Sequence, residues 1–81
     1  MNIDKKFKIT ICSDQEYKEL IAEVYFLENI VAIIDQEDGF NNLRISIFPN
    51  KIENWNFLFL EFMEALEYAK KRLWELRKIE N

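Results

Sequence analysis

Residues 58–76 read LFLEFMEALEYAKKRLWEL, the one stretch of this chain long and periodic enough to form a long helix. Its apolar residues recur with a period of 3.6, and most of the charged residues fall elsewhere around the axis. The apolar stripe predicted from this spacing consists of Leu58, Phe62, Ala65, Leu66, Ala69, Leu73 and Leu76. Packing of such a stripe, more than helix propensity, stabilises a helix in a protein, so the rest of the chain must supply an apolar surface opposite it.

Positive charge gathers toward the end of this helical segment. The basic residues there are Lys70, Lys71, Arg72, Arg77 and Lys78. Cations near a helix C-terminus interact favourably with the helix dipole, and Glu67 stands four residues before Lys71, the favourable order for an ion pair. We therefore interpret the basic cluster as a complement to the dipole and not as a phosphate site.

Length and composition limit both the fold and the chemistry. Eighty-one residues suffice for one hydrophobic core, so residues 1–81 are expected to form a single domain with one function. The chain has no histidine, the commonest general base and metal ligand, and its single cysteine, Cys12, cannot form an internal disulfide. We expect no enzymatic activity, no metal and no cofactor.

Charge and hydropathy indicate a cytoplasmic protein. The net charge of −4 argues against nucleic acid as a direct partner and favours a basic one, although mild acidity also serves solubility alone. No apolar run approaches the roughly 20 residues that cross a bilayer. Asp4, Lys6 and Lys8 interrupt any apolar segment that a signal peptide would require. Neither a membrane nor nucleic acid is expected as a direct partner.

Four segments before the helix have the patterns of β-strands. They are residues 5–12, 19–26, 30–34 and 43–48, in which apolar residues alternate with polar ones or β-branched residues dominate. In the second segment, the residues assigned to the core are Leu20, Ala22, Val24 and Phe26. Asp38-Gly39 is the strongest turn signal, and Gly39, the only glycine, is expected to need a positive φ angle. Short connections predict successive hairpins.

Residues 50–57 fit two patterns. Trp55, Phe57 and Phe59 alternate as in a strand, whereas Trp55 and Leu58 also fit the helical stripe. We favour a short edge strand at residues 55–58, with the helix under way by residue 60 or 61. The predicted fold is α+β, an antiparallel four- to five-stranded β-meander with one long C-terminal α-helix packed on one face.

The chain resembles a family of small bacterial proteins, the immunity proteins of contact-dependent growth inhibition and related polymorphic toxin systems. The resemblance covers about residues 6–74 and rests on the segments ELIAEVYF, IVAIIDQEDG, NNLRISIF and EALEYAKKRL, in this order. It implies a cytoplasmic protein that binds one cognate toxin domain, commonly a nuclease such as an RNase or tRNase, and blocks its active site or substrate surface. The first hairpin of the family usually carries a glycine, which residues 27–30 lack.

The sheet face away from the helix is the candidate binding surface. If the first hairpin turn has an even number of residues, this face combines Ile21, Glu23, Tyr25 and Leu27 with Ile30, Ala32 and Ile34. The next strand adds Arg44, Ser46 and Phe48 if its register keeps Leu43, Ile45 and Ile47 on the helix side. A solvated face would be mostly polar, so this apolar set is typical of an interface unless a chain segment folds over it. The candidate partner-binding residues are Glu23, Tyr25, Ile34, Asp35, Glu37, Asp38, Arg44 and Phe48.

These residues combine an aromatic anchor, Tyr25, with an acidic turn that would steer a basic toxin. Two alternatives remain open. The partner would instead dock on the helix flank around Met63, Lys70 and Trp74, or the chain would be a structural or regulatory module that self-associates through the open face as a weak homodimer.

Three other readings of single motifs are less favoured. The turn Asp35-x-Glu37-Asp38-Gly39 lacks the glutamate that closes an EF-hand loop, because position 46 is a serine. Cys12 has no histidine to activate it as a nucleophile. The aromatic residues at 55–59 are flanked by glutamates and not by the cations of a base-stacking surface, so we interpret them as core.

Overall fold

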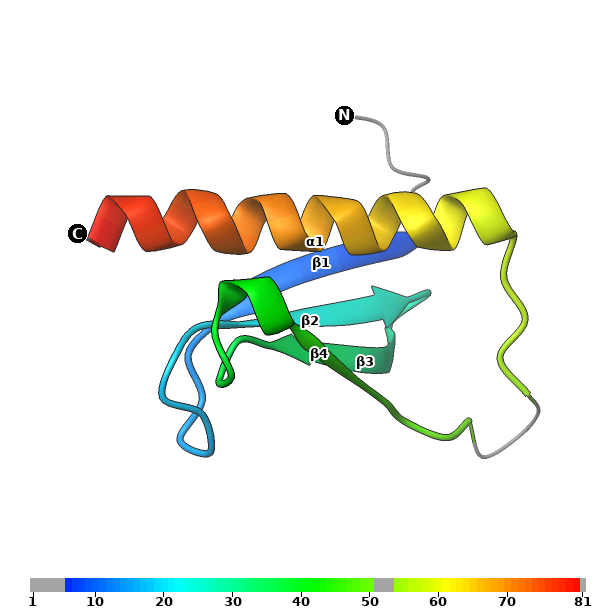
Figure 1. Ribbon diagram of the computed structural model, residues 1–81. Coiled ribbons are helices and arrows are strands. Elements are labelled where there is room, and N and C mark those ends of the chain that lie inside the picture. The colour runs from blue at the N-terminus through cyan, green and yellow to red at the C-terminus, as the bar shows by residue number, and fades with distance from the viewer. Residues whose placement is uncertain (1–5, 51–53, 81) are drawn as a thin grey trace.

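The computed structural model describes residues 6–50 and 54–80 of the chain, with side chains described up to residue 76. Its elements are β1 (Phe7–Cys12), β2 (Ile21–Phe26), β3 (Asn29–Asp35), the 3-10 helix η1 (Phe40–Asn42), β4 (Arg44–Ile47) and α1 (Phe59–Glu80). The strands form one antiparallel sheet in the order β1-β2-β3-β4, and α1 lies across one face of it (Figure 1). The predicted α+β meander with a C-terminal helix is confirmed.

The helix begins at Phe59, and the carbonyl of Leu58 accepts its first main-chain hydrogen bond, from Phe62 at 3.0 Å. The fully buried residues of the predicted stripe are Ala65, Ala69 and Leu73. Leu58 was predicted to belong to this stripe but is 68% exposed. It lies before the first helical residue, where the helical period does not yet set the direction of the side chain.

An aromatic cluster, and not a fifth strand, precedes the helix. Phe57 is central, with its ring centroid 4.7 Å from Phe26, 5.1 Å from Phe7 and 5.2 Å from Phe62, and Trp55 stacks on it at 5.5 Å. Residues 54–58 form no strand, so the predicted edge strand at 55–58 is wrong. Trp55 and Phe57 pack on the core without strand pairing, as their interpretation as core residues requires. Phe59 was also interpreted as core but is 73% exposed, because it is the first residue of α1 and lies outside the stripe that faces the sheet.

Two residues with positive φ angles join β2 to β3. Leu27 has φ 50° and Glu28 has φ 75°, as in a type I′ hairpin turn, where asparagine and glycine are preferred. For a residue with a Cβ atom, this left-handed conformation costs roughly 1–2 kcal/mol. The turn has the even length on which the predicted open face depends, but it holds strain that a glycine would avoid.

A β-bulge in β3 changes which residues face the helix. Val24 of β2 faces Ala32, but the next residue, Tyr25, faces Ile30, so Val31 is an extra residue in the ladder. A bulge of this kind reverses the alternation beyond it. Val31 and Ala32 are consequently both buried on the helix side.

The bulge corrects two predicted placements. Ala32 and Ile34 were assigned to the open face, yet they pair with Val24 and Ala22 on the helix side and belong to the hydrophobic core. Ile34 is only 5% exposed, so it is not available as a partner-binding residue.

The second turn follows the sequence expectation. Gly39 has φ 95°, the positive value expected for the only glycine, and the amide of Gly39 donates to the carbonyl of Gln36 at 3.0 Å. The short helix η1 then leads into β4, which spans Arg44–Ile47 and is slightly shorter than the predicted segment.

The helix covers only part of the sheet. It packs mainly on β1 and β2. Ile45 and Ile47 of β4 pair with Ile34 and Ala32 and so lie on the helix side, yet their exposed fractions are 43% and 59%. The helix side of β4 is therefore an uncovered apolar surface.

Candidate protein-binding surface

The face of the sheet away from α1 is built from rows of cross-strand neighbours. They are Thr10, Glu23, Ile33 and Ser46 in the middle row, Lys8, Tyr25 and Ile30 on one side, and Cys12, Ile21, Asp35 and Arg44 on the other. The face is more polar than predicted, because β1 adds Lys8 and Thr10 and the bulge replaces Ala32 and Ile34 by Ile33. It presents mixed polar and apolar side chains, as many protein interfaces do.

Tyr25 and Glu23 form a pair on this face. The Tyr25 hydroxyl donates to Oε1 of Glu23 at 3.1 Å, and this hydrogen bond, followed by partial burial, raises the pKa of Tyr25. Beside the pair lies a hollow of about 470 Å³, whose other lining residues are Lys6, Lys8, Thr10, Leu27 and Glu28. The strained hairpin tip therefore borders the predicted aromatic anchor.

One end of the open face is shielded. Ile21 was predicted to be exposed there but is fully buried, and it lies outside the core cluster beneath α1. The neighbouring thiol of Cys12 is half-buried, and burial raises its pKa, with further contributions from Glu23 and Asp14. A raised thiol pKa favours the unreactive protonated form.

The acidic turn after β3 serves partly to hold the fold together. The carboxylate of Glu37 accepts hydrogen bonds from the amides of Lys18, at 3.0 and 3.1 Å, and Glu19, at 3.0 Å. Asp38 forms an ion pair with Arg44, and its hydrogen bond to this guanidinium raises the pKa of Arg44. Glu37 and Asp38, predicted to steer a basic toxin, are therefore exposed residues with structural partners.

Asp35 and Gln36 are buried within the same turn. Asp35 is 7% exposed, and its Oδ1 accepts the amide hydrogen of Glu37 at 3.1 Å. Gln36 donates from Nε2 to the carbonyl of Leu20 at 2.8 Å. The Gln36 bond joins the β3–β4 turn to the connection between β1 and β2. The burial of Asp35 removes it from the accessible candidates.

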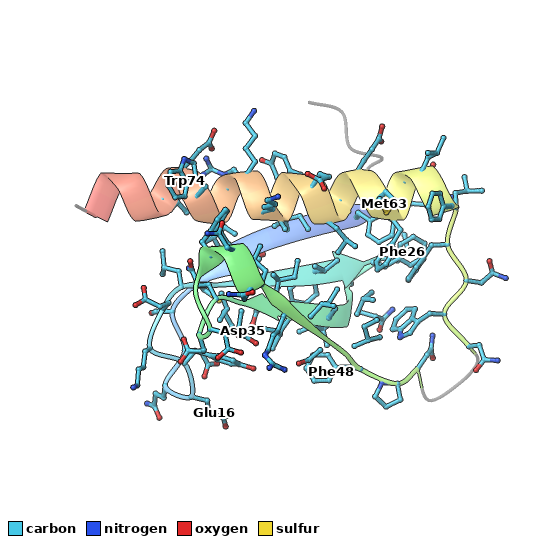
Figure 2. All side chains as sticks on the ribbon, in the orientation of Figure 1. Glu16, Phe26, Asp35, Phe48, Met63 and Trp74 are labelled. Atoms are coloured by element: carbon cyan, nitrogen blue, oxygen red, sulfur yellow. The ribbon has the colours of Figure 1, made fainter. Side chains whose placement is uncertain are left out.

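Negative charge is concentrated at this end of the molecule. Residues 13–20 and 35–38 together contain six acidic residues and one lysine, a net charge of −5 in a chain whose total is −4. We call the acidic residues of the two joined loops the acidic end; they are Asp14, Glu16, Glu19, Asp35, Glu37 and Asp38. Figure 2 shows Glu16 and Asp35 at the same end of the sheet, away from the helix. In the described part of the chain, the carboxylates of Glu16 and Glu19 have no hydrogen-bond or ion-pair partner.

Phe48, the last predicted binding residue, lies beyond β4. Its half-buried side chain points away from the helix in Figure 2, as expected, and its carbonyl accepts Nε1 of Trp55 at 2.7 Å. The structure thus groups Asp35, Glu37, Asp38 and Arg44 at one end of the sheet. Glu23 and Tyr25 lie farther along β2, and Phe48 follows the opposite end of β4.

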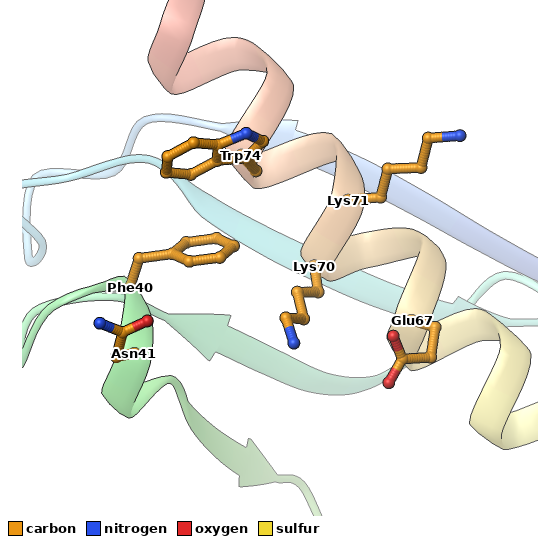
Figure 3. A pocket seen from close by; sticks show the side chains of 6 residues that line it. All are labelled: Phe40, Asn41, Glu67, Lys70, Lys71 and Trp74. Carbon is orange, nitrogen blue, oxygen red and sulfur yellow. The ribbon is translucent and has the colours of Figure 1, made fainter.

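The helix flank, the alternative docking surface, holds a second hollow. The rings of Phe40, in η1, and Trp74, in α1, are in contact, with their centroids 5.2 Å apart. The hollow beside them has a volume of about 430 Å³ and is also lined by Asn41, Glu67, Lys70 and Lys71 (Figure 3). Arg72, from the predicted dipole complement, is paired with Glu75 at 2.7 Å.

Two exposed apolar regions were missed by the sequence argument. One is the pair of isoleucines on β4, and the other is the run Leu58, Phe59 and Leu60, which is 68–73% exposed. Three consecutive large apolar residues at the start of an amphipathic helix cannot all lie in one stripe. Their presence in the sequence therefore indicates that some of them are exposed. For β4 no such signal existed, because alternation does not reveal how far a helix extends across a sheet.

Comparison with known proteins gives no family: no family model matches the chain, and neither does any curated protein or solved structure. None of the helices in the described part of the chain is long and apolar enough to cross a membrane. The same residues contain no group of three or more histidine, cysteine or acidic side chains that could hold a metal ion.

Proposed function

We propose that this chain is an immunity protein that binds one cognate bacterial toxin domain, a nuclease acting on RNA, and blocks its active site or substrate surface. The proposal begins with the four segments that resemble this family. The structural observation that supports it is the acidic end, where six of the fifteen acidic residues lie together and Glu37 joins the two loops.

Charge makes this end suitable for a nuclease partner. An enzyme that binds RNA presents a basic surface to its polyanionic substrate. A compact group of carboxylates can occupy that surface, and its field accelerates association at low ionic strength. Glu16 and Glu19 are the best candidates for direct contact, because both are exposed and their carboxylates have no hydrogen-bond or ion-pair partner among the described residues.

The Tyr25–Glu23 pair extends the proposed contact from the acidic end onto the open face. Tyr25 is half-buried beside a hollow. A partner side chain inserted into this hollow would exclude water from both its own surface and that of Tyr25. Aromatic residues in such positions contribute strongly to binding. The proposed surface therefore joins steering charges to one aromatic anchor.

The test begins with the adjacent gene, which should encode a toxin domain, and continues with binding and protection against that domain. The double variant Glu16→Lys with Glu19→Lys should bind at least about tenfold more weakly at low salt, with most of the loss in the association rate. The matched control is Glu64→Lys with Glu67→Lys, which changes the net charge equally on the helix. If the helix variant loses binding and the loop variant does not, the helix flank is the docking surface.

A second variant tests the anchor. Tyr25→Ala should weaken binding by at least about 2 kcal/mol and leave the fold intact, because Tyr25 lies outside the core beneath α1. Glu37 is kept unchanged in these experiments, since its carboxylate holds both loops. Full protection against the toxin by both the Tyr25 variant and the loop variant would contradict the proposal.

A further inference from the structure

The outer edge of β4 carries main-chain groups that no strand pairs with in the described chain. Arg44 and Ser46 face Asp35 and Ile33 across the β3–β4 ladder, and the amide of Phe48 donates to β3 at 2.8 Å. Hydrogen-bonded pairs alternate with non-bonded pairs in an antiparallel ladder. The N–H and C=O groups of Ile45 and Ile47 therefore point away from β3.

This edge lacks the usual protection. Edge strands are normally blunted by a charged side chain, a proline or a bulge within the strand. In β4 the only charge is Arg44, whose guanidinium is paired with Asp38. Ile45 and Ile47 are exposed on the helix side, Ser46 is exposed on the other, and Pro49 comes only after the strand has ended. The strand is short but otherwise open to pairing.

We infer that β4 pairs with β4 of a second copy of this chain, antiparallel about a two-fold axis, to give an eight-stranded sheet. In the register that this requires, Ser46 faces Ser46 of the second copy at the axis. Ile45 of each copy then faces Ile47 of the other. Both isoleucines use their outward main-chain groups, which gives four hydrogen bonds in all.

The side chains favour this register and a second copy as the occupant. The two Ile45–Ile47 pairs would bring four exposed isoleucines side by side on the helix side, a favourable cross-strand contact. Shifting the register to place Ile45 opposite residue 49 would lose a hydrogen bond, since Pro49 has no amide hydrogen. No acidic residue lies in β4, and each Arg44 would face Phe48 of the other copy, so like charges do not meet.

The dimer goes beyond the proposed toxin binding and does not depend on it. Asp35 and Arg44 pair at the start of β4, so antiparallel pairing places the two acidic ends at opposite ends of the shared edge. A two-fold contact uses the same edge in both copies, so no free β4 edge remains and the assembly stops at a dimer. Each copy would keep its acidic end accessible.

Sedimentation of the pure protein over a micromolar concentration series tests the inference. The wild type should reach twice the 9.9 kDa mass of the chain. Ile47→Pro removes an outward N–H and none of the β3–β4 hydrogen bonds, and it should raise the dimer dissociation constant at least about tenfold. Ile47→Val, the matched control, should change it by less than about twofold. A monomeric wild type, or a dimer unaffected by the proline, would overturn the inference.

Cross-linking tests the register even if the proline variant fails to fold. In a background of Cys12→Ser, Ser46→Cys should form an intermolecular disulfide readily, because the Cα atoms of a non-hydrogen-bonded pair lie about 4.5 Å apart. Ile45→Cys in the same background should not, since it would face Ile47. Equal cross-linking of both variants, or none with Ser46→Cys, would overturn the inference. A wild-type monomer whose toxin binding is lost with Ile47→Pro would assign the edge to the toxin instead.

Discussion

The half of the sheet beneath α1 and the strand beyond it contrast sharply, although both present apolar side chains on the same face. Under the helix even the small residues Ala22, Ala65 and Ala69 are fully buried. On β4 the larger Ile45 and Ile47 stay exposed. Apolar character at a strand position therefore indicates the face on which it lies, whereas burial depends on where the helix runs.

The largest expected effect separates these two regions directly. Leu73→Ala should lower the free energy of unfolding by about 2–5 kcal/mol, because it leaves a cavity in the fully buried contact. Ile47→Ala should change it by no more than about 0.5 kcal/mol at a protein concentration low enough to exclude association. Urea denaturation of both variants measures the difference. Equal losses would show that β4 is covered in solution.

The next effect concerns the turns on either side of β3. Replacing Leu27 by Asn together with Glu28 by Gly should stabilise the protein by about 1–2 kcal/mol, since both residues have positive φ angles. Gly39→Ala should destabilise it by about 1–3 kcal/mol, because φ 95° with ψ 156° is a conformation that essentially only glycine adopts, although a Cβ there would meet no atom within 4 Å. Thermal unfolding checks both signs. A loss of stability in the first variant would mean that Leu27 makes contacts worth more than the strain.

The smallest effect is a pH dependence on the open face. Folding raises the pKa of Tyr25 through its hydrogen bond to Glu23. The stabilisation from this bond is thus present below the ordinary tyrosine pKa of about 10 and is lost as the pH rises through the higher folded value. Glu23→Gln should lower the pKa of Tyr25, as followed by phenolate absorbance with Tyr25→Phe as the reference. An unchanged titration would show that the pair is not formed.

Much of the architecture follows from local patterns in the sequence. The alternation of Phe7, Ile9 and Ile11 indicates β1, and Gly39 marks the turn before β4. The bulge at Val31 could not be predicted, because residues 30–34 are uniformly apolar and a slip of one position leaves the pattern unchanged. That single residue moved Ile34 from the predicted binding face into the core.

The candidate site was less predictable than the fold. The sequence indicates an acidic turn, but hydrogen bonds between distant segments decide which carboxylates are presented. The carboxylate of Glu37 accepts hydrogen bonds from the main-chain amides of Lys18 and Glu19, and Asp35 is buried beside it. Glu16 and Glu19 are not among the predicted residues; they are the strongest candidates because the fold brings the two loops together.

The packing of α1 on β1 also has a consequence for synthesis on the ribosome. Cys12 ends the first strand, whereas Leu73 in the helix that covers it is made roughly 60 residues later. At about 5–20 residues per second, translation leaves the apolar face of β1 without its helix for roughly 3–12 s, and that of β2 for a shorter time. The nascent hairpin must remain unaggregated through this interval, when chaperone binding would matter most.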